Sequence, residues 1–124
     1  MSLLLDTNVL IWWLQESPRL GKQIRETITE EPKVVVSAVS AVEIAAKVAI
    51  GKLRVPGDLA VQITEQMMTE LPVTVRHGVA VGQLPMHHRD PFDRLLIAQA
   101  RCEGLTIVTA DRAFTAYDVP IMPA

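Results

Sequence analysis

The sequence predicts an α/β fold in which parallel strands are joined by helices. Short β-branched or apolar runs alternate with helical patterns along the whole chain, and this alternation is typical of parallel sheets with right-handed crossovers. Of the 124 residues, 49% are hydrophobic and only 4% are aromatic, which favours a core of Val, Ile, Leu and Ala between sheet and helices. The length suits a single domain over residues 1–124.

The first half of the chain contains two strand-to-helix units. The run "LLLD" predicts a strand, and "TNVLIWWLQE" after it has helical spacing. A second, partly exposed helix is expected in "SPRLGKQIRETITEEP", where Pro32 ends it. The β-branched "KVVVS" predicts the next strand, and "AVSAVEIAAKVAIGKL" the next helix. We expect one face of this helix to carry Val39, Val42, Ala46 and Ala49.

The second half is less regular until its last elements. Asp58 is expected to cap a helix whose apolar spacing continues to Met67. We expect the next strand at 72–75 and a short helix at 79–84. A helix from Pro91 to Glu103, closed by Gly104, precedes the most strand-like segment, "LTIVTAD". "VPIMP" predicts an edge strand at the end.

Composition narrows the function classes. A formal net charge of −2 provides no overall basic field, so nucleic-acid binding would need a local patch. The single cysteine, Cys102, cannot form an internal disulfide and reads as a buried thiol in a reducing cytoplasm. No stretch approaches the ~18 apolar residues that a bilayer crossing requires, and no targeting segment is recognised. We therefore expect a soluble, cytoplasmic protein with no membrane partner.

Four acidic residues share a position relative to the predicted sheet. Asp6 and Asp111 end apolar strands, whereas Glu43 and Asp93 open the helices alongside. In a parallel sheet these positions can converge on one edge, and ligand sites of such sheets lie beyond the carboxyl ends of the strands.

Each acid also has a local structural explanation. Asp6 and Asp111 are suited to capping the elements that follow them. Glu43 has the spacing of a capping box with Ser40 and of a helical ion pair with Lys47. These explanations account for each acid singly but not for their common location.

Converging carboxylates would need a cation. Four of them within a few ångströms repel one another by several kcal/mol unless a hard cation neutralises them. Mg²⁺ or Mn²⁺ prefers oxygen ligands, retains waters and can activate one of them. The chemistry that such a cluster suits is phosphodiester hydrolysis.

The stretch "HHRDPFDRLLIAQA" contains two aspartates with different expected roles. Asp90 precedes Pro91 and is a good N-cap, because proline is favoured at the first helical position. Asp93 then lies in the first turn. His87 and His88 lack zinc-site spacing, and we interpret them mainly as loop residues, for which phosphate contact is the best functional role.

Further polar residues flank the acids. Expected to orient carboxylates or metal-bound waters by hydrogen bonds are Thr7, Asn8 and Thr109. Candidate contacts to phosphate or RNA are Arg89, Arg94, Arg112 and Lys47.

Four motifs follow one another along the chain: "LLLDTNVLIWWL", "VSAVSAVEIAAKVAIGKL", "HHRDPFDRLLIAQA" and "TIVTADRAFTAYDV". They carry a resemblance to the PIN-domain ribonucleases, and most of all to the VapC toxins of type II toxin–antitoxin systems. It spans almost the whole chain and implies a three-layer α/β/α sandwich around a parallel five-stranded sheet. It also implies endonucleolytic cleavage of RNA that depends on Mg²⁺ or Mn²⁺.

The resemblance also implies roles for particular residues. The family's acidic tetrad falls on Asp6, Glu43, Asp93 and Asp111, so no acid is missing. Asp6 and Asp93 would be the main metal ligands, and Glu43 and Asp111 would complete the site and position water. A homodimer silenced by a cognate VapB-type antitoxin is the expected assembly.

Two alternatives remain open from the sequence. A phosphatase of the haloacid dehalogenase type also begins with an apolar strand ending in Asp, but it needs a second Asp two residues later, where this chain has Asn8. A non-catalytic binding module would use the acids only as caps and as contacts to a basic protein. Binding of Mg²⁺ or Mn²⁺ would separate it from an enzyme.

Overall fold

A computed structural model describes all residues from Met1 to Ala124. The strands are β1 (Ser2–Leu5), β2 (Lys33–Ser37), β3 (Thr69–Leu71), β4 (Thr106–Thr109) and β5 (Ile121–Pro123). They form one sheet in the order β3-β2-β1-β4-β5, and every neighbouring pair is parallel. The predicted parallel five-stranded sheet is thus confirmed, with its first strand at the centre.

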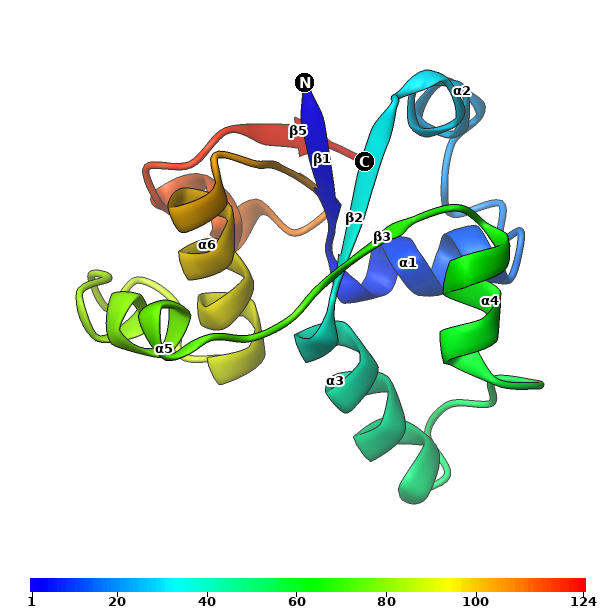
Figure 1. Cartoon of the computed structure of the whole chain (residues 1–124), viewed down its shortest axis with the longest axis horizontal. Helices are drawn as coiled ribbons and strands as arrows, with labels where there is room; N and C mark the ends of the chain where they lie inside the picture. Colours follow the sequence, from blue (N-terminus) through cyan, green and yellow to red (C-terminus); the bar gives the residue numbers. More distant parts are fainter.

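Helices cover both faces of this sheet (Figure 1). They are α1 (Thr7–Leu14), α2 (Lys22–Glu30), α3 (Ala38–Ala49), α4 (Leu59–Glu65), α5 (Val75–Gly82), α6 (Pro91–Glu103) and the 3-10 helix η1 (Arg112–Ala116). Helix α6, η1 and part of α5 pack against one face, and α1, α2 and α4 against the other. The result is the predicted three-layer sandwich. None of the helices combines the length and apolar composition that crossing a membrane requires.

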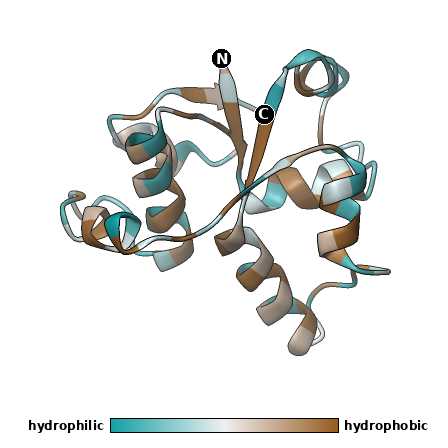
Figure 2. Ribbon diagram, in the orientation of Figure 1, coloured by the Kyte–Doolittle hydropathy of each residue, from teal (hydrophilic) through white to brown (hydrophobic).

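Strand β1 shows why the core divides into two layers. Leu4 belongs to the cluster under α6, whereas Leu3 and Leu5 belong to the cluster under α1, because successive side chains of a strand point to opposite faces. All three are fully buried. A strand covered on both faces is apolar at every position, and Figure 2 shows β1 and β2 as mainly hydrophobic and α2 as largely hydrophilic.

The region between residues 59 and 84 differs from the prediction. Helix α4 ends at Glu65, and Met67 is 90% exposed with a positive φ of 58°, so the helical pattern does not continue through it. The strand predicted at 72–75 is wrong, because β3 lies earlier and pairs with Val35–Ser37 of β2. The following helix begins at Val75 rather than at residue 79, since Thr74 and His77 form a capping box there.

The predicted face of α3 is confirmed at Val39 but is wrong at its other three positions. Val42 is 58% exposed, and Ala46 and Ala49 are exposed as well, whereas the buried residues are Val39, Ser40 and Ile44. The helix is rich in Ala and Val around its whole circumference, so apolar spacing alone could not select the face that meets the sheet.

The last third of the chain folds as predicted. Helix α6 spans Pro91–Glu103, with Asp90 as N-cap and Gly104 in the left-handed conformation at φ 66° after its last turn. This conformation favours glycine, because the Cβ atom of any other residue would clash with its own backbone there. Strand β5 lies at an edge of the sheet, as expected for "VPIMP".

Candidate active site at the carboxyl edge of the sheet

Asp6 lies at the junction of β1 and α1 and is only 5% exposed. Its Oδ1 accepts a hydrogen bond from the Val9 amide at 2.8 Å, so it caps α1, and its Oδ2 accepts one from the Thr109 hydroxyl. Burial, with a smaller contribution from the nearby carboxylates of Asp93 and Asp111, raises the pKa of Asp6 to about 6, although the two hydrogen bonds lower it. Asp6 is thus a carboxyl group held in place where its charge is disfavoured.

Asp93 lies in the first turn of α6, next to the helix N-terminus. Asp90 caps this helix by accepting from the amides of Phe92 at 2.9 Å and Asp93 at 3.0 Å, which leaves the Asp93 carboxylate free to project outward. Burial raises the pKa of Asp93, with Asp90 and Glu43 adding to the rise, while a hydrogen bond with His88 opposes it. The two aspartates of "DPFD" therefore divide as predicted into a cap and a side chain at the edge of the sheet.

Glu43 projects from the second turn of α3. Its Oε2 lies 3.4 Å from the Lys47 ammonium, which is the predicted helical ion pair. Its Oε1 is buried and has no hydrogen-bond partner. The predicted capping box with Ser40 is wrong, because Ser37 caps α3 and Ser40 lies inside the helix, where its hydroxyl accepts from Thr7 at 3.0 Å.

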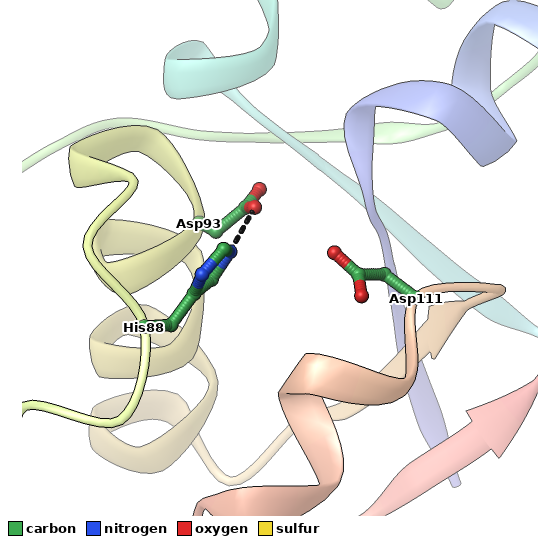
Figure 3. Close-up of side chains that lie close together, drawn as sticks. All are labelled: His88, Asp93 and Asp111. Carbon is green, nitrogen blue, oxygen red and sulfur yellow. Dashed lines mark hydrogen bonds and ion pairs between the residues drawn. The ribbon is translucent and has the colours of Figure 1, made fainter.

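Asp111 follows β4 and is exposed. It caps η1 by accepting from the Ala113 amide at 2.9 Å. Figure 3 shows its carboxylate facing Asp93 and His88 across a gap. One potential ligand atom from each of these three residues lies within 4.8 Å of the others.

The four acids therefore face one region at the carboxyl ends of β1, β2 and β4. Asp6 is within electrostatic reach of Asp93 and Asp111, and Asp93 of Glu43. The ligand atoms within 4.8 Å of one another come from His88, Asp93 and Asp111, and Glu43 adds a buried oxygen without a hydrogen-bond partner that lies in electrostatic reach of Asp93. Carboxylate oxygens suit a hard divalent cation, which would also relieve the repulsion among them. Asp6 offers the least free oxygen, because both of its atoms already accept hydrogen bonds.

His88 is a site residue whose contact with Asp93 was not predicted from the sequence. It stands two positions before the N-cap, and its Nε2 lies 2.7 Å from Asp93 Oδ2. Residues just before an N-cap often fold back onto the first turn of the helix, as in the hydrophobic staple. The position of His88 relative to "DPFD" carried this signal, which a search for metal-ligand spacing does not detect.

Arg94 is not available to RNA, so its prediction as a phosphate contact is wrong. The residue is 7% exposed, and its guanidinium donates to the carbonyl oxygens of Pro85 at 2.9 Å and Val81 at 3.0 Å. A guanidinium has five donors, and here they hold the loop before α6. Arg89 and Arg112 are exposed, and Lys47 is partly exposed.

The predicted hydrogen-bonding residues take different positions. Thr109 donates to Asp6, as described above. Thr7 donates to Ser40 and so connects α1 to α3 rather than to a carboxylate. Asn8 is exposed on the first turn of α1.

Comparison with known proteins agrees with the fold. The chain is 29% identical over 122 residues to Ribonuclease VapC22 of Mycobacterium tuberculosis, covering 96% of this chain and 94% of that protein. A crystal structure of VapBC2 from Rickettsia felis bound to a DNA fragment from their promoter superposes with a TM-score of 0.71 at 15% identity, covering 99% of this chain and 98% of that one.

A second solved structure is equally similar. DNA-bound VapBC from Salmonella typhimurium gives a TM-score of 0.72 at 21% identity, with 99% of this chain and 98% of that chain covered. At such identities the solved structures support the fold alone. The sequence profile of the PIN domain matches residues 3–120. The resemblance found in the sequence is thereby confirmed, and the chain belongs to the PIN domain family.

Proposed function

We propose that this chain is a metal-dependent endoribonuclease of the VapC type, the toxin of a toxin–antitoxin pair, and that residues 1–124 form one catalytic domain. The observation that carries the proposal is the convergence of Asp6, Glu43, Asp93 and Asp111 on one edge of the sheet. The relative VapC22 is named a ribonuclease, which supports RNA as the substrate.

The residues present fit a bound Mg²⁺ or Mn²⁺. Asp93, Asp111 and Glu43 present oxygens that internal hydrogen bonds leave partly free, whereas both oxygens of Asp6 already accept hydrogen bonds. When bound, such an ion neutralises the carboxylates and lowers the pKa of a water for attack on phosphorus. The chain's own contribution is to hold the carboxylates in a partly buried, fixed arrangement, with Glu43 and Asp111 placed to orient water.

Positive side chains at the rim supply contacts to the RNA backbone. Arg89 and Arg112 are exposed and are next in sequence to Asp90 and Asp111, and Lys47 lies beside Glu43. Guanidinium groups bind phosphate oxygens in a bidentate manner, which suits them to positioning a strand over carboxylates that would otherwise repel it.

Two partners belong to the proposal. The similar solved structures of Rickettsia felis and Salmonella typhimurium are VapBC assemblies, which supports a VapB-type antitoxin as a partner of this chain. We also propose a homodimer. Co-expression with the product of the adjacent reading frame, followed by size-exclusion chromatography with light scattering, tests both partners.

The activity is tested with purified protein and total cellular RNA. We expect Mn²⁺ or Mg²⁺ to produce discrete internal cleavage products, and EDTA to abolish them. Mapping the new ends identifies the target and the cleavage position. Intact RNA in the presence of both metals, alongside an active PIN-domain control, would contradict the proposal and favour a non-catalytic binding module.

A further inference from the structure

The histidine pair before α6 contains two side chains in different environments. His87 is exposed, and its ring meets Tyr117 edge-on with centroids 5.3 Å apart. The His88 side chain is 23% exposed, and its ring points at the acidic edge, where Nε2 lies 2.7 Å from Asp93 Oδ2 (Figure 3). Only the second histidine of the pair therefore contacts the proposed site.

The backbone of His88 is fixed from two sides. Its amide donates to the Tyr117 hydroxyl oxygen at 2.8 Å, and that hydroxyl lies 3.4 Å from the His88 carbonyl oxygen. The Arg94 guanidinium donates to the same hydroxyl oxygen at 3.2 Å. Tyr117 and Arg94 are themselves buried. The loop thus delivers the His88 ring to one position, as a supporting group must be held if it is to fix another side chain.

Hydrogen-bond chemistry defines what Nε2 does there. An ionised carboxylate oxygen can only accept, so an imidazole nitrogen at 2.7 Å from it carries the proton. A protonated ring nitrogen has no lone pair to offer a metal ion. In this arrangement His88 is a donor to Asp93 Oδ2, and Asp93 Oδ1 accepts no hydrogen bond within the protein.

We propose that His88 is a positioning residue, whose Nε2–H holds one oxygen of Asp93 so that the other is presented to a divalent cation. The inference rests on the proposed function, because it assigns Asp93 to metal binding. Partners that orient a metal ligand typically change metal affinity by about 10- to 100-fold when they are removed. Arg94 and Tyr117 contribute one step further away, by holding the His88 backbone.

Mn²⁺ affinity of the full-length chain, measured by isothermal titration calorimetry, tests the proposal. We expect His88→Ala to weaken Mn²⁺ binding by about 10- to 100-fold. His88→Gln should restore most of it, because its amide N–H lies near the position of Nε2, whereas the shorter His88→Asn should not. His87→Ala is the matched control and should bind Mn²⁺ like the wild type. Circular dichroism melts establish that each variant is folded, and His88→Asn serves if the alanine variant is not.

Pulsed electron paramagnetic resonance of the Mn²⁺-loaded wild type distinguishes a positioning residue from a ligand. We expect no directly coordinated ¹⁴N signal. A nitrogen coupling that disappears in His88→Gln would make His88 a metal ligand and overturn the proposal, as would wild-type affinity in both His88→Ala and His88→Asn. Failure of the wild type itself to bind Mn²⁺ would instead remove the proposed function, and this inference with it.

Discussion

Strand β1 and the residue that follows it place two opposite kinds of group in the same interior. Leu3, Leu4 and Leu5 are fully buried and apolar, and the next residue, Asp6, is a carboxyl group that is 5% exposed. Removing the leucines from water favours folding by about 1.5–3 kcal/mol for each side chain. Burying Asp6 has the reverse effect on its charged form, which is why its pKa rises to about 6.

The contrast shows that the body of the sheet and its carboxyl edge serve different purposes. Within the strands, burying the apolar side chains stabilises the fold. At the edge, Asp6, Asp93 and Asp111 are held close together although their charges repel, an arrangement that stability alone would not select. The close approach of these carboxylates is explained by a ligand that binds them.

Asp93→Asn should show the largest difference between the roles of the carboxyl edge and of the strands, because it should lower activity without lowering stability. The amide keeps the shape of the carboxylate but not its charge, so we expect RNA cleavage to fall by roughly a thousandfold or more. The melting temperature of the metal-free protein should stay the same or rise, because a repelling charge is lost. Initial cleavage rates and thermal melts measure the two effects. A fully active variant would show that Asp93 is not part of the machinery.

Leu4→Ala should produce the opposite pattern. Leu4 is 0% exposed in the centre of the sheet, and leucine-to-alanine changes in cores typically cost about 3–4 kcal/mol of unfolding free energy. Urea denaturation measures the loss, and cleavage per folded molecule should remain close to that of the wild type. A loss of activity without a loss of stability would contradict the division between strand and edge.

Asp6→Asn should stabilise the metal-free protein at high pH. The folded pKa of about 6 exceeds the ordinary value of 3.8, so the stability that Asp6 contributes is present below pH 3.8 and is lost as the pH rises through 6. At pH 8 in EDTA we expect the variant to exceed the wild type by up to roughly 3 kcal/mol. Near pH 3.5 the difference should vanish. Urea titrations across this pH range measure the difference in unfolding free energy between variant and wild type. A difference that does not depend on pH would count against a folded-state pKa of Asp6 above its ordinary value.

Asp90→Ala should have a small effect on stability and none on cleavage, because Asp90 is a helix cap and not part of the proposed site. Its carboxylate accepts from the amides of Phe92 and Asp93, and losing such a cap costs about 1 kcal/mol. Cleavage at a temperature where the variant is folded should be retained. If this variant lost activity without losing stability, the assignment of cap and site within "DPFD" would be reversed.

Local sequence signals were sufficient to predict a helix where capping residues close to it in the sequence fix both of its ends. In α6, Asp90 with Pro91 fixes the start and Gly104 fixes the end, so both boundaries and the position of Asp93 could be predicted. The alternation of strands and helices was likewise enough for the parallel sheet, since few other arrangements bury such a pattern.

Tertiary partners decided the rest. Strand β3 has the sequence "TEL", with no apolar alternation, and it is a strand only because β2 offers an edge to pair with. In α3, Val42 is exposed and Ile44 is buried although both are apolar, so composition could not choose between faces. The contacts of Arg94 depend on how the loop before α6 folds back, and no spacing within the sequence encodes them. The position of His88 two residues before the N-cap indicates contact with the first turn of α6, but it does not identify Asp93 as the partner.

The hydrogen bond from Thr109 to Asp6 joins groups that are 103 residues apart in the sequence. During synthesis, Asp6 leaves the ribosome long before Thr109 and Asp111 exist. The central strand β1 can therefore pair with β4 only late in synthesis. Contacts between residues so far apart in sequence slow folding. A partly made chain that has not reached Thr109 therefore lacks the hydroxyl group that holds the Asp6 carboxyl in place, and it also lacks Asp111, one of the four acids.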